Sequence, residues 1–344
     1  MKKFLSIALA LLMVCVMLPV VALAAEKTAL TYDELTNAIS TANDGDTIKL
    51  LADIDLSQTI TVNKTITLNM NGKKLYNTSE LWEKPTDDNW SLISVRGSGN
   101  LTITGNGTFA AQENDCYAVD VQGGATVTIK NGTFIGNVHA VYVLTGTANV
   151  EGGTYSVQQK YPDPAKADEF VLNCYDAHHK DGTARINVTG GTFKNFNPAN
   201  NAAEGKGNNF ADNSLVVQKN NTVQNNDFYV GNAANEVIAA ASKGEEIFVL
   251  NGTTLTNVPA GVIIQNGTDG EITVNGEKIG PNEGGDSGYV VPAPTTIVII
   301  TPTEDTPKTD DQKNPTTGAN DFVGLAAAAA VVALLGSAVV LRKK

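Results

Sequence analysis

Cysteine is scarce in this sequence: there are only 3 among 344 residues, and Cys15 lies in an apolar stretch near the N-terminus. With Cys116 and Cys174 alone left over, the sequence excludes the disulfide framework that holds many small secreted domains together. Positive charge is also in short supply, because 36 acidic residues against 24 basic ones give a formal net charge of −12. Such a chain repels phosphate backbones, which argues against a role in binding nucleic acid.

The N-terminus carries a targeting pattern. Lys2 and Lys3 precede an apolar stretch over residues 4–23, and alanines stand at positions 22 and 24. A short basic region, an apolar core and a small-x-small site are typical of a secretory signal peptide. We therefore expect residues 1–24 to be removed and the remaining chain to be exported.

The C-terminus combines three features. Residues 322–341 carry no charge and are long enough to cross a bilayer as a transmembrane helix of about 20 residues. A basic tail follows at 342–344, which favours the cytoplasmic side. The pentapeptide 314–318 stands just before the apolar segment, where Pro315 restricts the backbone and Gly318 leaves the preceding peptide bond unshielded.

This order resembles the cell-wall sorting signal of Gram-positive surface proteins, in the NPxTG variant of the LPxTG motif. The matching residues are Asn314, Pro315, Thr316, Thr317 and Gly318. The resemblance implies that a sortase transpeptidase cleaves after Thr317 and joins it to cell-wall peptidoglycan, so that the membrane holds the protein only before sorting. Asn314 stands where leucine is commoner, which leaves the sortase class open. Without sorting, the protein would be a membrane-anchored extracellular domain.

Between the two ends, four segments repeat one pattern. Each alternates apolar and polar residues, passes through Asn or Gly, and ends in Thr and an aromatic residue. The segments are LTITGNGTF ending at Phe109, VTIKNGTF ending at Phe134, ANVEGGTY ending at Tyr155 and INVTGGTF ending at Phe193. Alternation of period two predicts half-buried strands, and the same alternation places strands at 47–51, 60–62 and 65–70.

Repetition about every 20–25 residues predicts the coils of a parallel β-helix solenoid. Identical positions would stack about 4.8 Å apart, so the four aromatic residues should form an internal stack. Gly132, Gly153 and Gly191 would permit the turn before each Thr. An antiparallel sandwich also has many short strands, but its turns need not repeat the same residues in the same order, so the solenoid is favoured.

A capping helix is predicted at the N-terminal end of the solenoid. Thr31 and Glu34 form a capping box that opens a helix to about residue 43. We divide the chain into the signal peptide, a cap over 25–46, the solenoid over 47–280, a Pro/Thr/Asp-rich linker over 281–313 and the sorting signal over 314–344.

The repeats, together with the stretch from 45 to 75, resemble the right-handed β-helix proteins of the pectate-lyase-like superfamily, over roughly residues 30–280. The expected fold class is thus all-β, a right-handed parallel β-helix solenoid with a short N-terminal helix and a C-terminal transmembrane helix. The superfamily contains lyases, hydrolases and adhesins, so the resemblance specifies fold better than activity. By this resemblance, lyases of the superfamily use acidic residues to hold calcium. We would expect a cofactor, calcium, only if this protein is a lyase.

Stacking the predicted coils gives two outward columns of side chains. One column holds Ser94, Asp120, Tyr142 and Asn173, and the next holds Arg96, Gln122, Leu144 and Tyr175. One carboxylate in a column is too few for calcium, which takes six to eight oxygen ligands, or for a glycosidase, which needs two facing carboxyl groups. Aromatic faces beside polar groups suit sugar recognition, so Arg96, Asp120, Tyr142 and Tyr175 are candidate ligand-binding residues, although exposed tyrosines are also ordinary strand residues.

The densest polar cluster leads from Asp176 to Arg185. Its candidates for metal binding or acid–base catalysis are Asp176, His178, His179, Asp181 and Arg185. The spacing matches no zinc signature, and a solvated loop between two strands is the favoured interpretation.

We therefore expect a wall-anchored surface protein that acts as an adhesin or binds glycans, on a host surface or elsewhere. The alternatives are a polysaccharide lyase or glycoside hydrolase on the same scaffold, and a purely structural surface protein.

Overall fold

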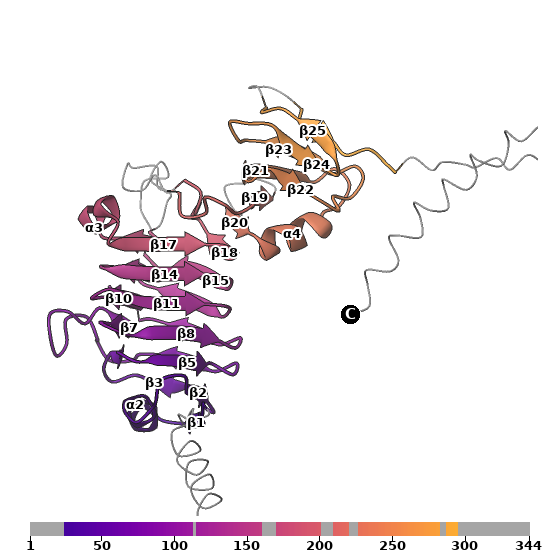
Figure 1. Cartoon of the computed structure of the whole chain (residues 1–344). Helices are drawn as coiled ribbons and strands as arrows, with labels where there is room; N and C mark the ends of the chain where they lie inside the picture. Colours follow the sequence, from indigo (N-terminus) through magenta and orange to yellow (C-terminus); the bar gives the residue numbers. More distant parts are fainter. Residues whose placement is uncertain are drawn as a thin grey trace, which may run out of the picture. The chain divides into compact units, whose positions relative to one another are not determined.

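The computed structural model describes residues 24–112, 115–159, 170–200, 209–219, 226–282 and 287–294. Most of its strands pair in parallel with strands of the neighbouring coils, and the coils stack on one another, an arrangement compatible with a β-helix solenoid (Figure 1). From β2 to β15, each strand pairs in parallel with the strand three positions later in the chain, so every coil up to β18 adds one strand to each of three sheets. Parallel pairing excludes the antiparallel sandwich for this part of the chain.

The three sheets are numbered here 1, 2 and 3, and the chain passes through them in the repeating order 1, 3, 2. Sheet 1 contains β1 (Glu26–Ala29), β2 (Thr47–Leu50), β5 (Thr65–Asn69), β8 (Asn100–Thr104), β11 (Ala125–Ile129), β14 (Gly146–Val150) and β17 (Ala184–Val188). Sheet 3 begins with β3 (Ile54–Asp55), β6 (Lys74–Tyr76), β9 (Thr108–Ala110), β12 (Thr133–Gly136), β15 (Thr154–Val157) and β18 (Gly191–Lys194). Sheet 2 contains β4 (Ile60–Val62), β7 (Ser91–Arg96), β10 (Tyr117–Gln122), β13 (Val141–Val143) and β16 (Leu172–Cys174).

The predicted N-terminal helix is present as α2 (Tyr32–Ser40), and it ends earlier than the expected residue 43. The Oγ1 atom of Thr31 accepts a hydrogen bond from the Glu34 amide at 3.2 Å, and the Glu34 carboxylate accepts from the Leu30 amide at 2.8 Å. These two bonds satisfy amides that a helix start would otherwise leave unpaired. The buried face of α2, with Leu35 and Ile39, packs into the core at this end of the chain. Strand β1 was not predicted, and it pairs in parallel with β2.

The predicted aromatic stack is confirmed. Phe109, Phe134, Tyr155 and Phe193 occupy equivalent positions in β9, β12, β15 and β18, and all four are fully buried. Their ring centroids are 4.7, 5.1 and 5.0 Å apart in sequence order, with interplanar angles of 10–12°. The parallel register brings each ring directly onto the ring of the previous coil, so one aromatic residue per repeat produces a continuous stack.

The glycines before these aromatic residues also perform the predicted role. Gly132, Gly153 and Gly191 have φ angles of +116°, +101° and +119°, in the region that favours glycine. A Cβ atom on Gly153 would lie 2.9 Å from the carbonyl oxygen of Gly132, and one on Gly191 would lie 3.0 Å from that of Gly153. The coils therefore approach each other closely at this corner, where any side chain would meet backbone.

The succession of parallel coils ends at β18, and sheet 3 continues beyond it through strands that pair antiparallel, apart from one parallel pair. The added strands, in spatial order, are β20 (Asp227–Val230), β19 (Val216–Lys219), β21 (Glu246–Asn251), β23 (Ile263–Asn266) and β26 (Tyr289–Val290). Strand β26 lies in the segment predicted to be a linker. Helix α4 (Asn232–Ala239) and a small sheet of β22 (Thr254–Leu255), β24 (Ile272–Val274) and β25 (Glu277–Ile279) complete this part, which has its own hydrophobic core.

Candidate functional site

Sheet 2 differs from sheet 1 in being covered on its outward face. Strands of sheet 1 such as β11 alternate between buried and half-buried residues, whereas every residue of β10 is buried. The cover is residues 77–90, the covering segment, which links β6 to β7 in place of a short turn. Trp82 of this segment packs edge-on against Tyr117 with ring centroids 5.2 Å apart, and Trp90 packs edge-on against Tyr142 at 6.3 Å.

These contacts form an aromatic cluster, made of Trp82, Trp90, Tyr117, His139 and Tyr142. It contains both tryptophans of the chain. Tyr117 and His139 are buried, while Trp82, Trp90 and Tyr142 are each partly exposed. The cluster therefore presents an apolar aromatic surface to solvent, supported from below by the strands of sheet 2.

His139 is a supporting member of this cluster. Its ring stacks on Tyr142 with centroids 5.3 Å apart and an interplanar angle of 11°, and its Nδ1 atom lies 2.7 Å from the Phe170 carbonyl oxygen, to which it donates a hydrogen bond. Burial lowers the pKa of His139 to about 4, so the imidazole is neutral near pH 7. A neutral, stacked imidazole fixes the orientation of the Tyr142 ring.

Asp120 lies beneath the cluster with no exposed surface. Its carboxylate accepts hydrogen bonds from Ser94 Oγ at 3.0 Å and Gln122 Nε2 at 2.7 Å, and it makes a short hydrogen bond with Ser91 Oγ. Burial raises its pKa to about 6, although the hydrogen bonds from Ser91, Gln122 and Ser94 act in the opposite direction. Asp120 is thus an interior group that reaches no ligand while the covering segment is in place.

Arg96 ties the covering segment to sheet 2. Its guanidinium donates to Asp88 Oδ2 at 2.6 Å, to the Asp88 carbonyl at 2.7 Å and to Asn89 Oδ1 at 2.9 Å, and its Nε atom donates to Ser94 Oγ at 2.7 Å. Gln122 adds a bond of 3.1 Å to the Asp88 carbonyl. All of these donors are used within the protein, so Arg96 acts as a clamp on the covering segment.

The register predicted for the ligand-binding column is confirmed. Ser94, Asp120, Tyr142 and Asn173 pair in succession across β7, β10, β13 and β16, and Arg96 pairs with Gln122. The expected exposure is wrong for most of the column, because Ser94, Asp120 and Asn173 are all buried. Tyr142 keeps a partly exposed ring, and Tyr175 is 47% exposed at the end of β16.

The polar cluster from Asp176 to Arg185 is a short helix and its C-terminal turn instead of a loop. Helix α3 (Asp176–Asp181) ends at Gly182 in the left-handed conformation. His178 Nδ1 lies 2.6 Å from the Leu144 carbonyl, His179 Nδ1 lies 3.4 Å from the Ala184 carbonyl, and Arg185 Nε donates to the Gly182 carbonyl at 3.0 Å. Hydrogen bonds from Thr183 lower the pKa of Asp181. Each of these candidate side chains contacts local backbone or a neighbouring turn, an arrangement that holds the turn together.

Two further predictions concern metals and membranes. Within the described ranges, no group of three or more His, Cys, Asp or Glu side chains is placed to hold a metal ion. In that same part of the chain no helix combines the length and apolar character that a membrane span needs. The signal peptide up to residue 23, the sorting motif Asn314–Gly318 and the apolar segment 322–341 lie outside the described residues.

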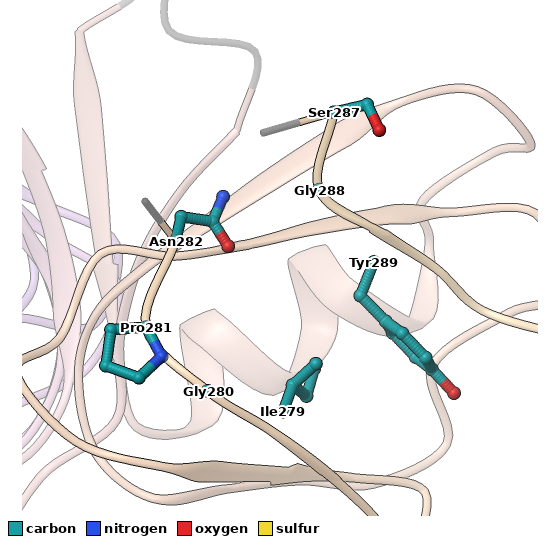
Figure 2. Close-up of a pocket in the computed structure, with 7 residues that line it drawn as sticks. All are labelled: Ile279, Gly280, Pro281, Asn282, Ser287, Gly288 and Tyr289. Carbon is teal, nitrogen blue, oxygen red and sulfur yellow. The ribbon is translucent and has the colours of Figure 1, made fainter. Parts of the chain in front are cut away.

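Among the residues that the structure describes, surface hollows also lie away from the aromatic cluster. One, of about 390 Å³, lies between residues 279–282 and 287–289 (Figure 2). The Asn282 amide there is already engaged, since its Oδ1 accepts from the Asn266 amide at 3.2 Å and its Nδ2 donates to Gln265 Oε1. Another, of about 360 Å³, lies between α4 and residues 256–257 and is lined mainly by exposed polar side chains. Neither gathers groups that suggest a reaction.

Comparison with known proteins found no match to this chain among family models, curated proteins or solved structures.

Proposed function

We propose that this chain is an exported surface protein that binds glycans while covalently attached to the cell wall of a Gram-positive bacterium. In this proposal the stacked coils form a right-handed parallel β-helix of the pectate-lyase-like type, residues 1–24 direct export, and a sortase joins Thr317 to peptidoglycan. The linker then holds the solenoid away from the wall, where it acts as an adhesin towards host or other surfaces.

The aromatic cluster is the observation that carries the glycan-binding part. Trp82, Trp90 and Tyr142 are partly exposed and lie together on a covered sheet, with ring centroids of 6.3 Å between Trp82 and Trp90 and between Trp90 and Tyr142. Aromatic rings bind the apolar faces of sugars while neighbouring polar groups bind hydroxyls. The rings are held in place by β-ladder hydrogen bonds and by the Arg96 clamp, so little entropy is lost on binding.

Binding suits this geometry better than catalysis. The only carboxylate in the predicted column, Asp120, is buried and hydrogen-bonded to three side chains, so it is shielded from any substrate on the outer surface. The candidates in and beside α3 make local bonds, since His178 lies against the Leu144 carbonyl and Arg185 donates to the Gly182 carbonyl.

The attachment to the wall is tested by mass spectrometry of protein released from cell walls with a muramidase. We expect a C-terminal peptide that ends at Thr317 and carries a wall fragment. A released chain that continues to Lys344 would contradict attachment, and the protein would then be anchored only by its membrane segment.

Glycan binding is tested with residues 25–317, the form predicted after processing, on an array of polysaccharides. We expect Trp90→Ala to weaken binding at least tenfold, which corresponds to about 1.4 kcal/mol. The control is Tyr229→Ala, which removes a partly buried tyrosine from β20, in the part of the chain with the second core. An equal loss in both variants, or no binding by the unmodified protein, would refute the assignment of the site.

A further inference from the structure

The charges around the aromatic cluster restrict the class of glycan that it can accept. The covering segment carries four carboxylates, Glu80, Glu83, Asp87 and Asp88, and all four are exposed. Only two basic residues lie in the stretch from 77 to 96, namely Lys84 and Arg96. The stretch therefore carries a net negative charge on the side of sheet 2 where the aromatic rings are exposed.

Both basic residues are already paired. Lys84 Nζ makes an ion pair with Glu80, and Arg96 directs its guanidinium to Asp88 at 2.6 Å and to Asn89. Two carboxylates, Glu83 and Asp87, have no ion pair among the described residues. An anionic ligand would meet repulsion here, and the two cations of the stretch are already engaged.

The rings themselves argue against a cation as the ligand. A site for a quaternary ammonium group needs several aromatic faces that converge on one open point. In this cluster the rings meet edge to face, with interplanar angles of 77° between Trp82 and Tyr117 and 82° between Trp90 and Tyr142, so their faces do not converge on one point. Trp82, Trp90 and Tyr142 are each partly exposed, and an aromatic ring face suits the flat apolar side of a sugar ring.

Polar groups at the rim can complete such a contact. The Trp90 indole donates to the Asp87 carbonyl at 3.1 Å, whereas the Trp82 indole N–H has no hydrogen-bond partner among the described residues. It can therefore donate to a sugar oxygen. The carboxylates of Glu83 and Asp87 can accept hydrogen bonds from sugar hydroxyls, a role for which uronic acids and sulfated sugars are poorly suited because they bring charge of the same sign.

We propose that the aromatic cluster selects neutral pyranose polysaccharides and rejects uronic-acid or sulfated ones. The selection rests on the proposed glycan-binding function, because it names the ligand class of the same site. The aromatic surface supplies affinity for any pyranose ring, and the carboxylates of Glu83 and Asp87 supply the discrimination.

The test compares polymers that differ only in charge. Residues 25–317 are titrated with several uronic-acid polymers, with the carboxyl-reduced forms of the same polymers, and with neutral glucans and galactans. We expect at least one neutral polymer to bind, and each acidic form to bind at least tenfold more weakly than its reduced counterpart at low salt. That difference should shrink as salt is added, because screening reduces the repulsion.

A variant separates charge from ring contact. Asp87→Lys should strengthen binding of the acidic polymers several-fold, and it should not strengthen binding of the neutral ones, because it removes an acceptor for sugar hydroxyls. The matched control is Asp212→Lys, which makes the same change of net charge at an exposed position outside the covering segment. Both variants should retain the circular dichroism spectrum of the unmodified protein.

The outcomes distinguish the two proposals. If no polymer of either kind binds, the glycan-binding function fails and the selectivity fails with it. If polymers bind but the acidic forms bind as tightly as the reduced forms, or if Asp212→Lys acts as strongly as Asp87→Lys, the selectivity is wrong while glycan binding stands.

Discussion

Replacing Asp120 with asparagine should change how the stability of the protein depends on pH. Asp120 has no exposed surface, and burial raises its pKa from 3.8 to about 6. The folded protein therefore binds a proton at this site more tightly than the unfolded chain does. The hydrogen bonds allow for the proton: Ser91 Oγ can donate its one hydrogen to the Ile93 carbonyl at 2.7 Å and accept one from a protonated Asp120.

The sign and size of the effect follow from linkage. Because the folded pKa is raised, the stabilisation from protonating Asp120 is fully present below pH 3.8 and is lost as the pH rises through about 6. This increase in the pKa of Asp120 corresponds to roughly 3 kcal/mol of unfolding free energy at most. The asparagine side chain is neutral at every pH, so the variant lacks this contribution. Relative to the unmodified protein, Asp120→Asn should therefore gain stability between pH 4 and pH 7.

The assay is chemical denaturation of both proteins at steps of half a pH unit, followed by circular dichroism. We expect the difference in unfolding free energy to shift by about 2–3 kcal/mol in favour of Asp120→Asn, mostly between pH 4 and pH 6. The control is Asp53→Asn, which neutralises an exposed carboxylate. A difference that stays constant within about 0.5 kcal/mol across this range would refute the reasoning, since Asp120 would then titrate as if solvated.

Three further predictions concern the solenoid itself, and each is checked by the midpoint of denaturation. Phe134→Ala, in the middle of the aromatic stack, should cost about 3–5 kcal/mol because it leaves a cavity between two rings, and an effect below about 1 kcal/mol would contradict the stack. Gly153→Ala should cost more than about 1 kcal/mol, because its φ is +101° and the new Cβ would lie 2.9 Å from the Gly132 oxygen; Gly270→Ala, with open space around it, should be nearly neutral. Thr31→Ala should cost about 1 kcal/mol through loss of the helix cap, and an unchanged midpoint would show that α2 does not need it.

The coils could be predicted from the sequence because their positions repeat. The Thr and aromatic pair ending each repeat marks one residue per coil, and parallel pairing turns this regularity into the stack from Phe109 to Phe193. The strands after β18 lack such a repeat. Several of them pair antiparallel with their neighbours, and a pattern of alternation alone does not distinguish antiparallel from parallel neighbours. Strand β26 has only two residues, which is too short for alternation to be recognised in the sequence.

The candidate site was only half visible for a related reason. Register could be predicted, so Arg96, Asp120 and Tyr142 were correctly placed in their two neighbouring columns. The extent to which each is covered could not be predicted, because it depends on residues 77–90, which show no alternation. One signal was present: both tryptophans of the chain lie within this irregular insertion between strands of neighbouring coils. Large aromatic side chains in such an insertion indicate that it packs on the sheet.

Gln122 connects the buried carboxylate directly to the covering segment that carries the exposed tryptophan rings. Gln122 donates to Asp120 beneath the sheet surface and to the Asp88 carbonyl in the covering segment. The carbonyl of the adjacent residue, Asp87, accepts from the Trp90 indole. The polar network therefore sets where the covering segment lies, whereas the rings contact the ligand in the proposed function. Asp120→Asn should consequently alter stability far more than glycan affinity, and Trp90→Ala the reverse. If both variants lost affinity in proportion to stability, the cluster would be a structural closure of sheet 2 and not a binding surface.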